Sequence, residues 1–272
     1  MMNSTNLSNY SGTRRMAMLI DGDNAQPSLI EKMLAETSKY GLITIRRIYG
    51  DWTSSNMGGW KDVLQTYAIQ PIQQFRYTIG KNATDSAMII DAMDILYTGG
   101  VDGFCLVSSD SDYTRLATRI REKGFFVMGI GKKTTPRAFV NGCDLFVYTN
   151  NLIPEPVRTP AVSPAANSNL RGGAKKKPST ITAPVAVEPV EPVIPDPLPL
   201  LRNAFEIASQ EDGWAFLGTL GHHLRQLDPG FDSRTYGFKQ LSLLIQAFPK
   251  VFEVKEVKSS DGTSVIYVRS IE

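Results

Sequence analysis

Acidic side chains that follow apolar runs are the residues of this sequence best suited to do chemistry. Residues 16–20 are apolar and lead into Asp21, and a second apolar run leads into Asp110 and Asp112. Asp85 begins a predicted helix and lies near the centre of its apolar stripe. Burying a carboxylate there is costly unless something pairs with it, so Asp85 is a candidate site residue.

The chemistry that these acids predict depends on whether they meet. One of Asp110 and Asp112 is explained as a helix N-cap, but capping does not require both. Converging carboxylates repel and raise one another's pKa unless a cation neutralises them. Oxygen ligands favour Mg²⁺ or Mn²⁺, and no Cys or His spacing is typical of zinc. Such an ion can activate water beside a phosphodiester, so we predict metal-assisted phosphodiester hydrolysis.

Strand and helix patterns alternate from residue 16 to residue 152, which predicts an α/β fold with a mainly parallel sheet and helices on both faces. The carboxyl edge of such a sheet would collect Asp21, Asp85, Asp110 and Asp112. Expected strands after the first are 42–50, 69–75, 103–107, 125–130 and 145–148, and expected helices include 59–68, 84–97, one that Gly124 ends and one after Pro136.

The remaining sequence divides into a tail, a linker and a second domain. We expect a disordered tail over 1–13, a nuclease-like domain over 14–153, a linker over 154–198 and a small domain over 199–272. Eleven of the sixteen prolines lie between residues 154 and 199, where large apolar residues are scarce. Helices are expected over 200–208, 214–227 and 233–247, followed by a hairpin of strands 251–257 and 264–269. Together these elements describe a winged helix-turn-helix.

Composition excludes several classes of protein. The chain of 272 residues is 42% hydrophobic, and no apolar run approaches the ~20 residues that cross a bilayer. The tail lacks the apolar core of a signal peptide. Cys105 and Cys143 lie in apolar runs typical of buried free thiols, so we expect a reducing cytoplasm. A net charge of +2 is too small to indicate nucleic-acid binding by itself.

Three separated motifs carry a family resemblance. They are I-D-G-D-N at 20–24, K-x-x-x-D at 81–85 with Asp91 downstream, and S-S-D-S-D-Y at 108–113; C-D-L-F at 143–146 also fits. Over about residues 14–152 the chain resembles the NYN family, the PIN-like ribonuclease domains that include the LabA-like proteins.

This resemblance implies a metal-dependent ribonuclease, expected to be an endonuclease. It implies that Asp21, Asp85, Asp110 and Asp112 bind the metal, with Asn24 supporting them through hydrogen bonds. Asp144 is either an outlying member of this set or a structural cap. Lys81 matches the basic residue that the family carries ahead of its second Asp. Further candidates for phosphate contact are Arg46, Arg47, Arg76, Lys132, Lys133 and Arg137.

The C-terminal domain resembles the OST-type helix-turn-helix, or LOTUS, domain. The motifs are W-A-F-L-G-T-L-G at 214–221, P-G-F at 229–231, Y-G-F-K-Q-L at 236–241 and V-I-Y-V at 265–268. This resemblance implies RNA recognition or protein docking. Eight Lys/Arg against nine Asp/Glu from residue 198 onward argue against a broad phosphate-binding surface and favour readout by a few residues such as Tyr236, Lys239 and Gln240. His222 and His223 are adjacent and cannot form a metal pair on one helix face.

Two other functions fit parts of the sequence. Asp21 and Asp23 form a D-x-D after a strand, as in phosphatases of the haloacid dehalogenase type, but that motif requires Thr or Val where Ala25 stands. A non-catalytic RNA-binding or regulatory protein would keep the acidic set as a site that binds but does not cut.

Overall fold

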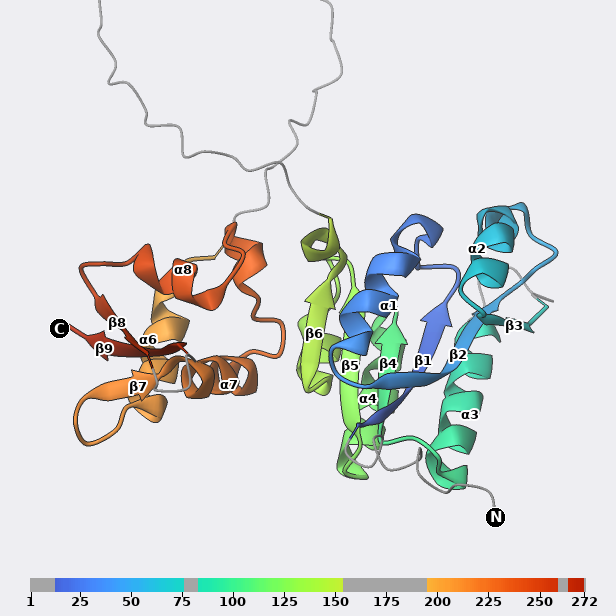
Figure 1. Cartoon of the computed structure of the whole chain (residues 1–272). Helices are drawn as coiled ribbons and strands as arrows, with labels where there is room; N and C mark the ends of the chain where they lie inside the picture. Colours follow the sequence, from blue (N-terminus) through green and yellow to red (C-terminus); the bar gives the residue numbers. More distant parts are fainter. Residues whose placement is uncertain (1–12, 76–82, 154–194, 259–263, 272) are drawn as a thin grey trace, which may run out of the picture. The chain divides into compact units, whose positions relative to one another are not determined.

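A computed structural model describes residues 13–75, 83–153, 195–258 and 264–271 (Figure 1). Its larger sheet has six parallel strands in the order β3-β2-β1-β4-β5-β6. This confirms the predicted α/β fold and parallel sheet. The strands are β1 (Arg15–Asp21), β2 (Leu42–Gly50), β3 (Gln70–Gln73), β4 (Gly103–Val107), β5 (Phe126–Gly131) and β6 (Leu145–Tyr148).

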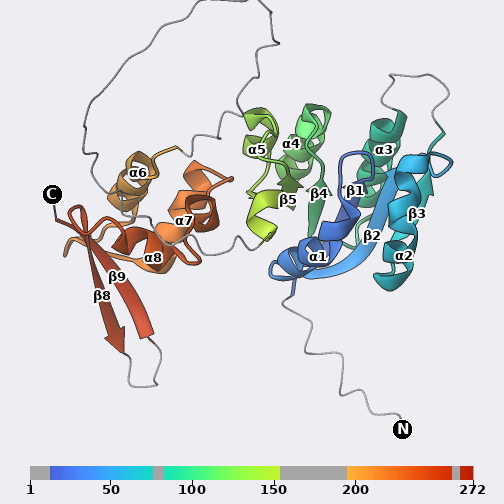
Figure 2. The ribbon, with the colours of Figure 1, turned by 90° about the horizontal axis from the view of Figure 1, so that it is seen from above.

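Helices cover both faces of this sheet, as Figure 2 shows from above. One face carries the short 3-10 helix η2 (Pro27–Leu29), α1 (Ile30–Ser38), η3 (Ser55–Trp60), α2 (Lys61–Thr66) and η5 (Thr149–Leu152). The other carries α3 (Ala83–Thr98), η4 (Ser111–Tyr113), α4 (Thr114–Glu122) and α5 (Arg137–Gly142). Gly124 ends α4 with a φ of 81°, as predicted for a helix-terminating glycine.

Alternation along β1 decides which face receives the first acid. Met16, Met18 and Ile20 pack into the core on the α1 face, whereas Ala17 and Leu19 pack into the core on the α3 face. Because strand side chains alternate with a period of two, Asp21 follows Ala17 and Leu19 toward the α3 face. The chain thus directs Asp21 toward the layer that carries Asp85.

The α3 helix is anchored by apolar and polar contacts. Met88 and Ala92 are fully buried, as the predicted stripe requires, and Asp94 is exposed. Asp91 accepts a hydrogen bond from Arg47 Nη1 at 2.5 Å and another from the hydroxyl of Tyr49, both on β2. These bonds tie the middle of α3 to the sheet.

The C-terminal part has its own core and an antiparallel sheet in the order β7-β9-β8. The pairing of β8 with β9 confirms the predicted hairpin, whose turn lies outside the described residues. Together with three helices, this sheet forms the winged helix-turn-helix. The elements are α6 (Leu198–Ala208), β7 (Trp214–Phe216), α7 (Leu217–Leu227), η6 (Ser233–Tyr236), α8 (Leu241–Gln246), β8 (Phe252–Lys258) and β9 (Ser264–Ser270).

The bounds predicted for two helices of the C-terminal part were wrong. Residues 214–216 are a strand rather than the start of a helix, because they pair with residues 267–269 of β9. The helix predicted over 233–247 is interrupted at Gly237, whose φ of 83° is left-handed. Only its first and last portions are helical, as η6 and α8.

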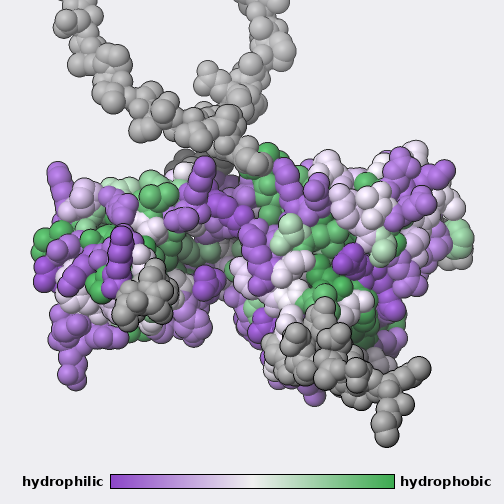
Figure 3. Space-filling model, in the orientation of Figure 1, coloured by the Kyte–Doolittle hydropathy of each residue, from purple (hydrophilic) through white to green (hydrophobic). Residues whose placement is uncertain are grey.

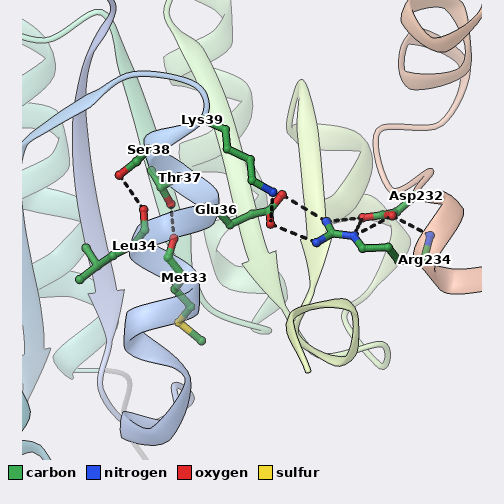
Figure 4. A network of polar contacts seen from close by, with 8 residues as sticks. All are labelled: Met33, Leu34, Glu36, Thr37, Ser38, Lys39, Asp232 and Arg234. Atoms are coloured by element: carbon green, nitrogen blue, oxygen red, sulfur yellow. Dashed lines mark hydrogen bonds and ion pairs between the residues drawn. The ribbon is translucent and has the colours of Figure 1, made fainter. Parts of the chain in front are cut away.

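Polar contacts of α1 are shown in Figure 4. Glu36, which is only 6% exposed, accepts hydrogen bonds from Lys39 Nζ at 2.8 Å and from both terminal nitrogens of Arg234 at 3.0 and 3.1 Å. Arg234 also binds Asp232. A buried carboxylate is tolerated here because cations pair with it.

The surface visible in Figure 3 is largely hydrophilic, with apolar side chains exposed in places. Within the described ranges, no helix combines the length and the apolar content that crossing a bilayer requires. Cys105 and Cys143 are both buried and free, as predicted. Most of the predicted linker and tail lies outside the described residues.

Candidate metal and active site

Three of the predicted acids meet at the carboxyl edge of the parallel sheet. Asp85 comes from the first turn of α3, and Asp110 and Asp112 come from the turn after β4. One carboxylate oxygen from each lies within 4.8 Å of the others. Because β1 and β4 are neighbours and the chain order reverses there, this is the topological switch point where open α/β sheets bind ligands.

Asp85 is half-buried among other negative charges. Burial raises the pKa of its carboxyl group, and the charges of Asp110 and Asp112 raise it further. A hydrogen bond from the Tyr113 hydroxyl at 2.7 Å opposes this rise. The net direction is upward, which is expected of carboxylates gathered without a cation.

Polar side chains of the turn after β4 form hydrogen bonds within the turn and also contribute to the acidic cluster. Asp110 is the N-cap of η4, and its carboxylate accepts a hydrogen bond from the Asp112 amide at 2.9 Å. The Asp110 amide in turn donates to Ser108 Oγ at 3.1 Å. Capping therefore explains the conformation of Asp110, and it still leaves both acids in the cluster with Asp85.

Asp21 lies at the end of β1 with only 1% of its surface exposed. Its carboxylate accepts hydrogen bonds from Asn24 Nδ2 at 2.7 Å, from Ser108 Oγ at 2.8 Å and from the Asp23 amide at 3.1 Å. The bond from Asn24 is the one expected from the sequence. Burial raises the pKa of Asp21, and the charge of Asp85 adds to this rise. The carboxylates within 4.8 Å of one another are those of Asp85, Asp110 and Asp112, and Asp21 is not among them.

Glycine is required directly after Asp21. The Gly22 amide donates to the Tyr49 carbonyl at 2.9 Å. A Cβ atom on Gly22 would lie 2.6 Å from Met57 Cε and 2.8 Å from the Tyr49 oxygen. No other residue fits this close approach, which fixes the turn that carries Asp21.

The predicted basic residues do not all lie at this edge. Lys132 and Lys133 directly follow β5, and the Lys132 amide donates to Ser109 Oγ at 2.8 Å, beside Asp110. Arg46 instead lies within β2 and donates to the Tyr67 carbonyl at 2.9 Å. The other predicted candidates either pair elsewhere, as Arg47 does with Asp91 and Arg137 with Asp228, or lie outside the described residues, as Arg76 and Lys81 do.

Two residues of the site were not predicted from the sequence to have a role there. Ser108 is 2% exposed and links Asp21 to the turn of Asp110, and Tyr113 is fully buried and binds Asp85. Both belong to the S-S-D-S-D-Y motif, so their positions were visible but their partners were not. Asp144 lies at the other edge of the sheet, where it accepts a hydrogen bond from the Val127 amide, so its structural interpretation holds.

Residues suggested for RNA readout in the C-terminal domain are partly exposed. Lys239 and Gln240 are exposed, and the Tyr236 ring packs against Phe231 with centroids 5.9 Å apart. Gln240 is also the N-cap residue of α8. These contacts fix Tyr236 in place and leave Lys239 available to solvent.

Models of two protein families match the sequence. The NYN domain matches residues 15–152, and the OST-HTH/LOTUS domain matches residues 194–262. An uncharacterized protein of Methanocaldococcus jannaschii is 28% identical over 124 residues, which cover 44% of this chain and 48% of that protein. The chain therefore spans about half the length of this curated relative.

Two solved structures also align with parts of the chain. One is a protein of unknown function from Vibrio parahaemolyticus, 18% identical, with a TM-score of 0.43, covering 52% of this chain and 94% of that one. The other is an uncharacterized protein from Nitrosomonas europaea, 30% identical, with a TM-score of 0.27, covering 36% of this chain and 93% of that one.

Proposed function

Because the chain belongs to the NYN domain family and contains an OST-HTH/LOTUS domain, we propose that it is a metal-dependent ribonuclease, acting as an endonuclease on RNA phosphodiester bonds. The observation that supports this most is the meeting of Asp85, Asp110 and Asp112 within 4.8 Å at the carboxyl edge of the sheet. Asp85 comes from α3, whereas Asp110 and Asp112 come from the turn after β4, so the fold and not local sequence brings Asp85 to the other two.

The donor set fits a hard divalent cation. All three groups are carboxylates, which suit Mg²⁺ or Mn²⁺ better than zinc. We propose that Asp85, Asp110 and Asp112 hold this ion. We also propose Asp21, whose carboxylate Asn24 orders, as a fourth metal-binding carboxylate. Such an ion lowers the pKa of bound water and binds phosphodiester oxygens.

Substrate contacts are proposed for basic residues at the same edge. Lys132 and Lys133 follow β5 next to the acidic cluster and are suited to bind RNA phosphates. We also propose Lys81 and Arg76, which the sequence suggests, as phosphate contacts. Arg46 lies within β2 and bonds to the Tyr67 carbonyl, which supports a structural role for this side chain. We further propose that the C-terminal domain selects the RNA or a protein partner, and that the protein acts in the cytoplasm.

A phosphatase mechanism through a covalent Asp21 intermediate has less support. A nucleophilic carboxylate must reach its substrate, but Asp21 is 1% exposed and accepts three hydrogen bonds.

The proposal is tested by incubating the full-length protein with total RNA in Mn²⁺ or in EDTA and sequencing the new RNA ends. Asp110→Asn should abolish cleavage, because asparagine still caps η4 but carries no charge. Asp94→Asn, an exposed acid on α3, is the matched control and should cut normally. Cleavage that persists in EDTA or in Asp110→Asn would refute the proposal. Tight RNA binding without any cleavage would favour a non-catalytic RNA-binding protein.

A further inference from the structure

A buried tyrosine holds one of the acids in the cluster. The hydroxyl of Tyr113 donates a hydrogen bond to Asp85 Oδ1 at 2.7 Å. Tyr113 directly follows Asp112 in the sequence and is the last residue of η4. One short turn therefore supplies two of the three clustered carboxylates, and its last side chain contacts the third.

The ring of Tyr113 cannot move freely. It is 0% exposed, belongs to the core on the α3 face, and packs against Phe139 with ring centroids 6.4 Å apart. A tyrosine hydroxyl carries its proton at neutral pH, so it acts as the donor to the Asp85 carboxylate.

We propose that Tyr113 is a positioning residue that fixes the carboxylate of Asp85 for binding a divalent cation together with Asp110 and Asp112. This inference rests on the metal site proposed above. The hydrogen bond occupies one oxygen of Asp85 and fixes the plane of the carboxylate, so less conformational freedom is lost when a cation binds. Residues that orient metal ligands in this way commonly contribute 10- to 100-fold to metal affinity.

A second buried tyrosine that bonds to an aspartate of α3 provides a matched control. Tyr49 is also 0% exposed, and its hydroxyl also donates to a carboxylate of α3, that of Asp91. Asp91 is paired with Arg47 and does not belong to the acidic cluster. Removing either hydroxyl thus takes one buried tyrosine–aspartate bond from α3, but only Tyr113 contacts a proposed metal ligand.

The experiment compares Tyr113→Phe, Tyr49→Phe and the wild type as full-length proteins. Mn²⁺ binding is measured by isothermal titration calorimetry, and thermal unfolding in EDTA reports on the fold. We expect Tyr113→Phe to weaken Mn²⁺ binding about tenfold or more, and Tyr49→Phe to leave it within about twofold. Any RNA cleavage lost in Tyr113→Phe should return at high Mn²⁺ concentration, because the ligands themselves are intact.

Several results would overturn the inference. Unchanged Mn²⁺ affinity in Tyr113→Phe, or an equal loss in both variants, would leave Tyr113 a purely structural role. So would loss of a cooperative unfolding transition in Tyr113→Phe while Tyr49→Phe still folds. A wild type that binds no Mn²⁺ would refute the metal site as well. A wild type that binds Mn²⁺ but cuts no RNA would refute only the ribonuclease, because the affinity comparison still decides the role of Tyr113.

Discussion

Changing Asp85 to asparagine should have opposite effects on stability with and without metal. Asp85 lies with Asp110 and Asp112 so that one oxygen from each is within 4.8 Å of the others. Two unit charges at that distance repel by about 0.9 kcal/mol in bulk water and by about 3.5 kcal/mol at an effective dielectric constant of 20. Asparagine removes the charge but keeps an oxygen that accepts the Tyr113 hydrogen bond.

The expected gain lies near the lower of these values, because Asp112 is exposed and Asp85 is only half-buried. We expect Asp85→Asn to raise the free energy of unfolding by about 1 kcal/mol in EDTA, which corresponds to about 2–4 °C in the melting midpoint. The sign follows from the raised pKa of Asp85. The ionised form is disfavoured in the folded protein, so the stability that this group contributes is present at low pH and lost as pH rises through the folded-state pKa.

Adding metal should reverse which protein, the wild type or Asp85→Asn, has the higher melting midpoint. A cation at a concentration of 100 times its Kd stabilises the wild type by about 2.7 kcal/mol, whereas a variant that has lost a ligand gains much less. The wild type should therefore melt below Asp85→Asn in EDTA and above it in saturating Mn²⁺. Differential scanning fluorimetry in the two buffers measures this crossover.

Asp91→Asn is the control on the same helix. It removes the charge that pairs with Arg47 and leaves one acceptor oxygen where two are used, so it should lower the melting midpoint equally in EDTA and in Mn²⁺. A wild type that is more stable than Asp85→Asn even in EDTA would refute the reasoning, because the clustered charges would then not be in net repulsion.

Three further predictions concern the surroundings of the site and the rest of the fold. Gly22→Ala should lower the free energy of unfolding by about 2 kcal/mol, because its Cβ would lie 2.8 Å from the Tyr49 carbonyl oxygen, a backbone atom; an unchanged urea midpoint would contradict the close approach. The pKa of Glu36 is below its usual value, since the bonds from Arg234 and Lys39 outweigh the effect of burial. Glu36→Gln should therefore be less stable than the wild type at pH 7, and this difference should disappear as pH falls from about 4.3 through the lower folded-state pKa. Urea unfolding that gives the same difference at pH 7 and at about pH 3 would argue against this pairing. Burial raises the pKa of the Cys105 thiol to about 12, so iodoacetamide at about pH 8 should leave Cys105 unmodified in the native protein, as mass spectrometry can measure; labelling as fast as in urea would show that the thiol is accessible.

The sequence predicted those elements whose signals are local. The strands over 42–50, 103–107 and 145–148 have the predicted bounds, because each begins and ends at clear local breaks in the sequence pattern. Residues 214–216 were misassigned because their apolar pattern continues into α7 without interruption. Their pairing with β9, more than fifty residues away, makes them a strand, and no local pattern contains that information.

The candidate site was predictable to a similar degree. Asp85 could be chosen because it lies within an apolar stripe, and Asp110 and Asp112 because capping requires only one of them. The roles of Ser108 and Tyr113 could not, since both depend on β1 lying beside β4 and on α3 crossing next to η4. Gly237 is the reverse case. A glycine within 233–247 is a local sign of a helix break, but the predicted helix ran through it.

The six residues from Ser108 to Tyr113 combine tasks that proteins often distribute over several loops. Ser108 contacts Asp21, Asp110 and Asp112 belong to the acidic cluster, and Tyr113 reaches Asp85. Deleting a single codon within this segment would shift the register of every later side chain against fixed partners on β1 and α3. Homologous chains should therefore keep the length of this segment constant.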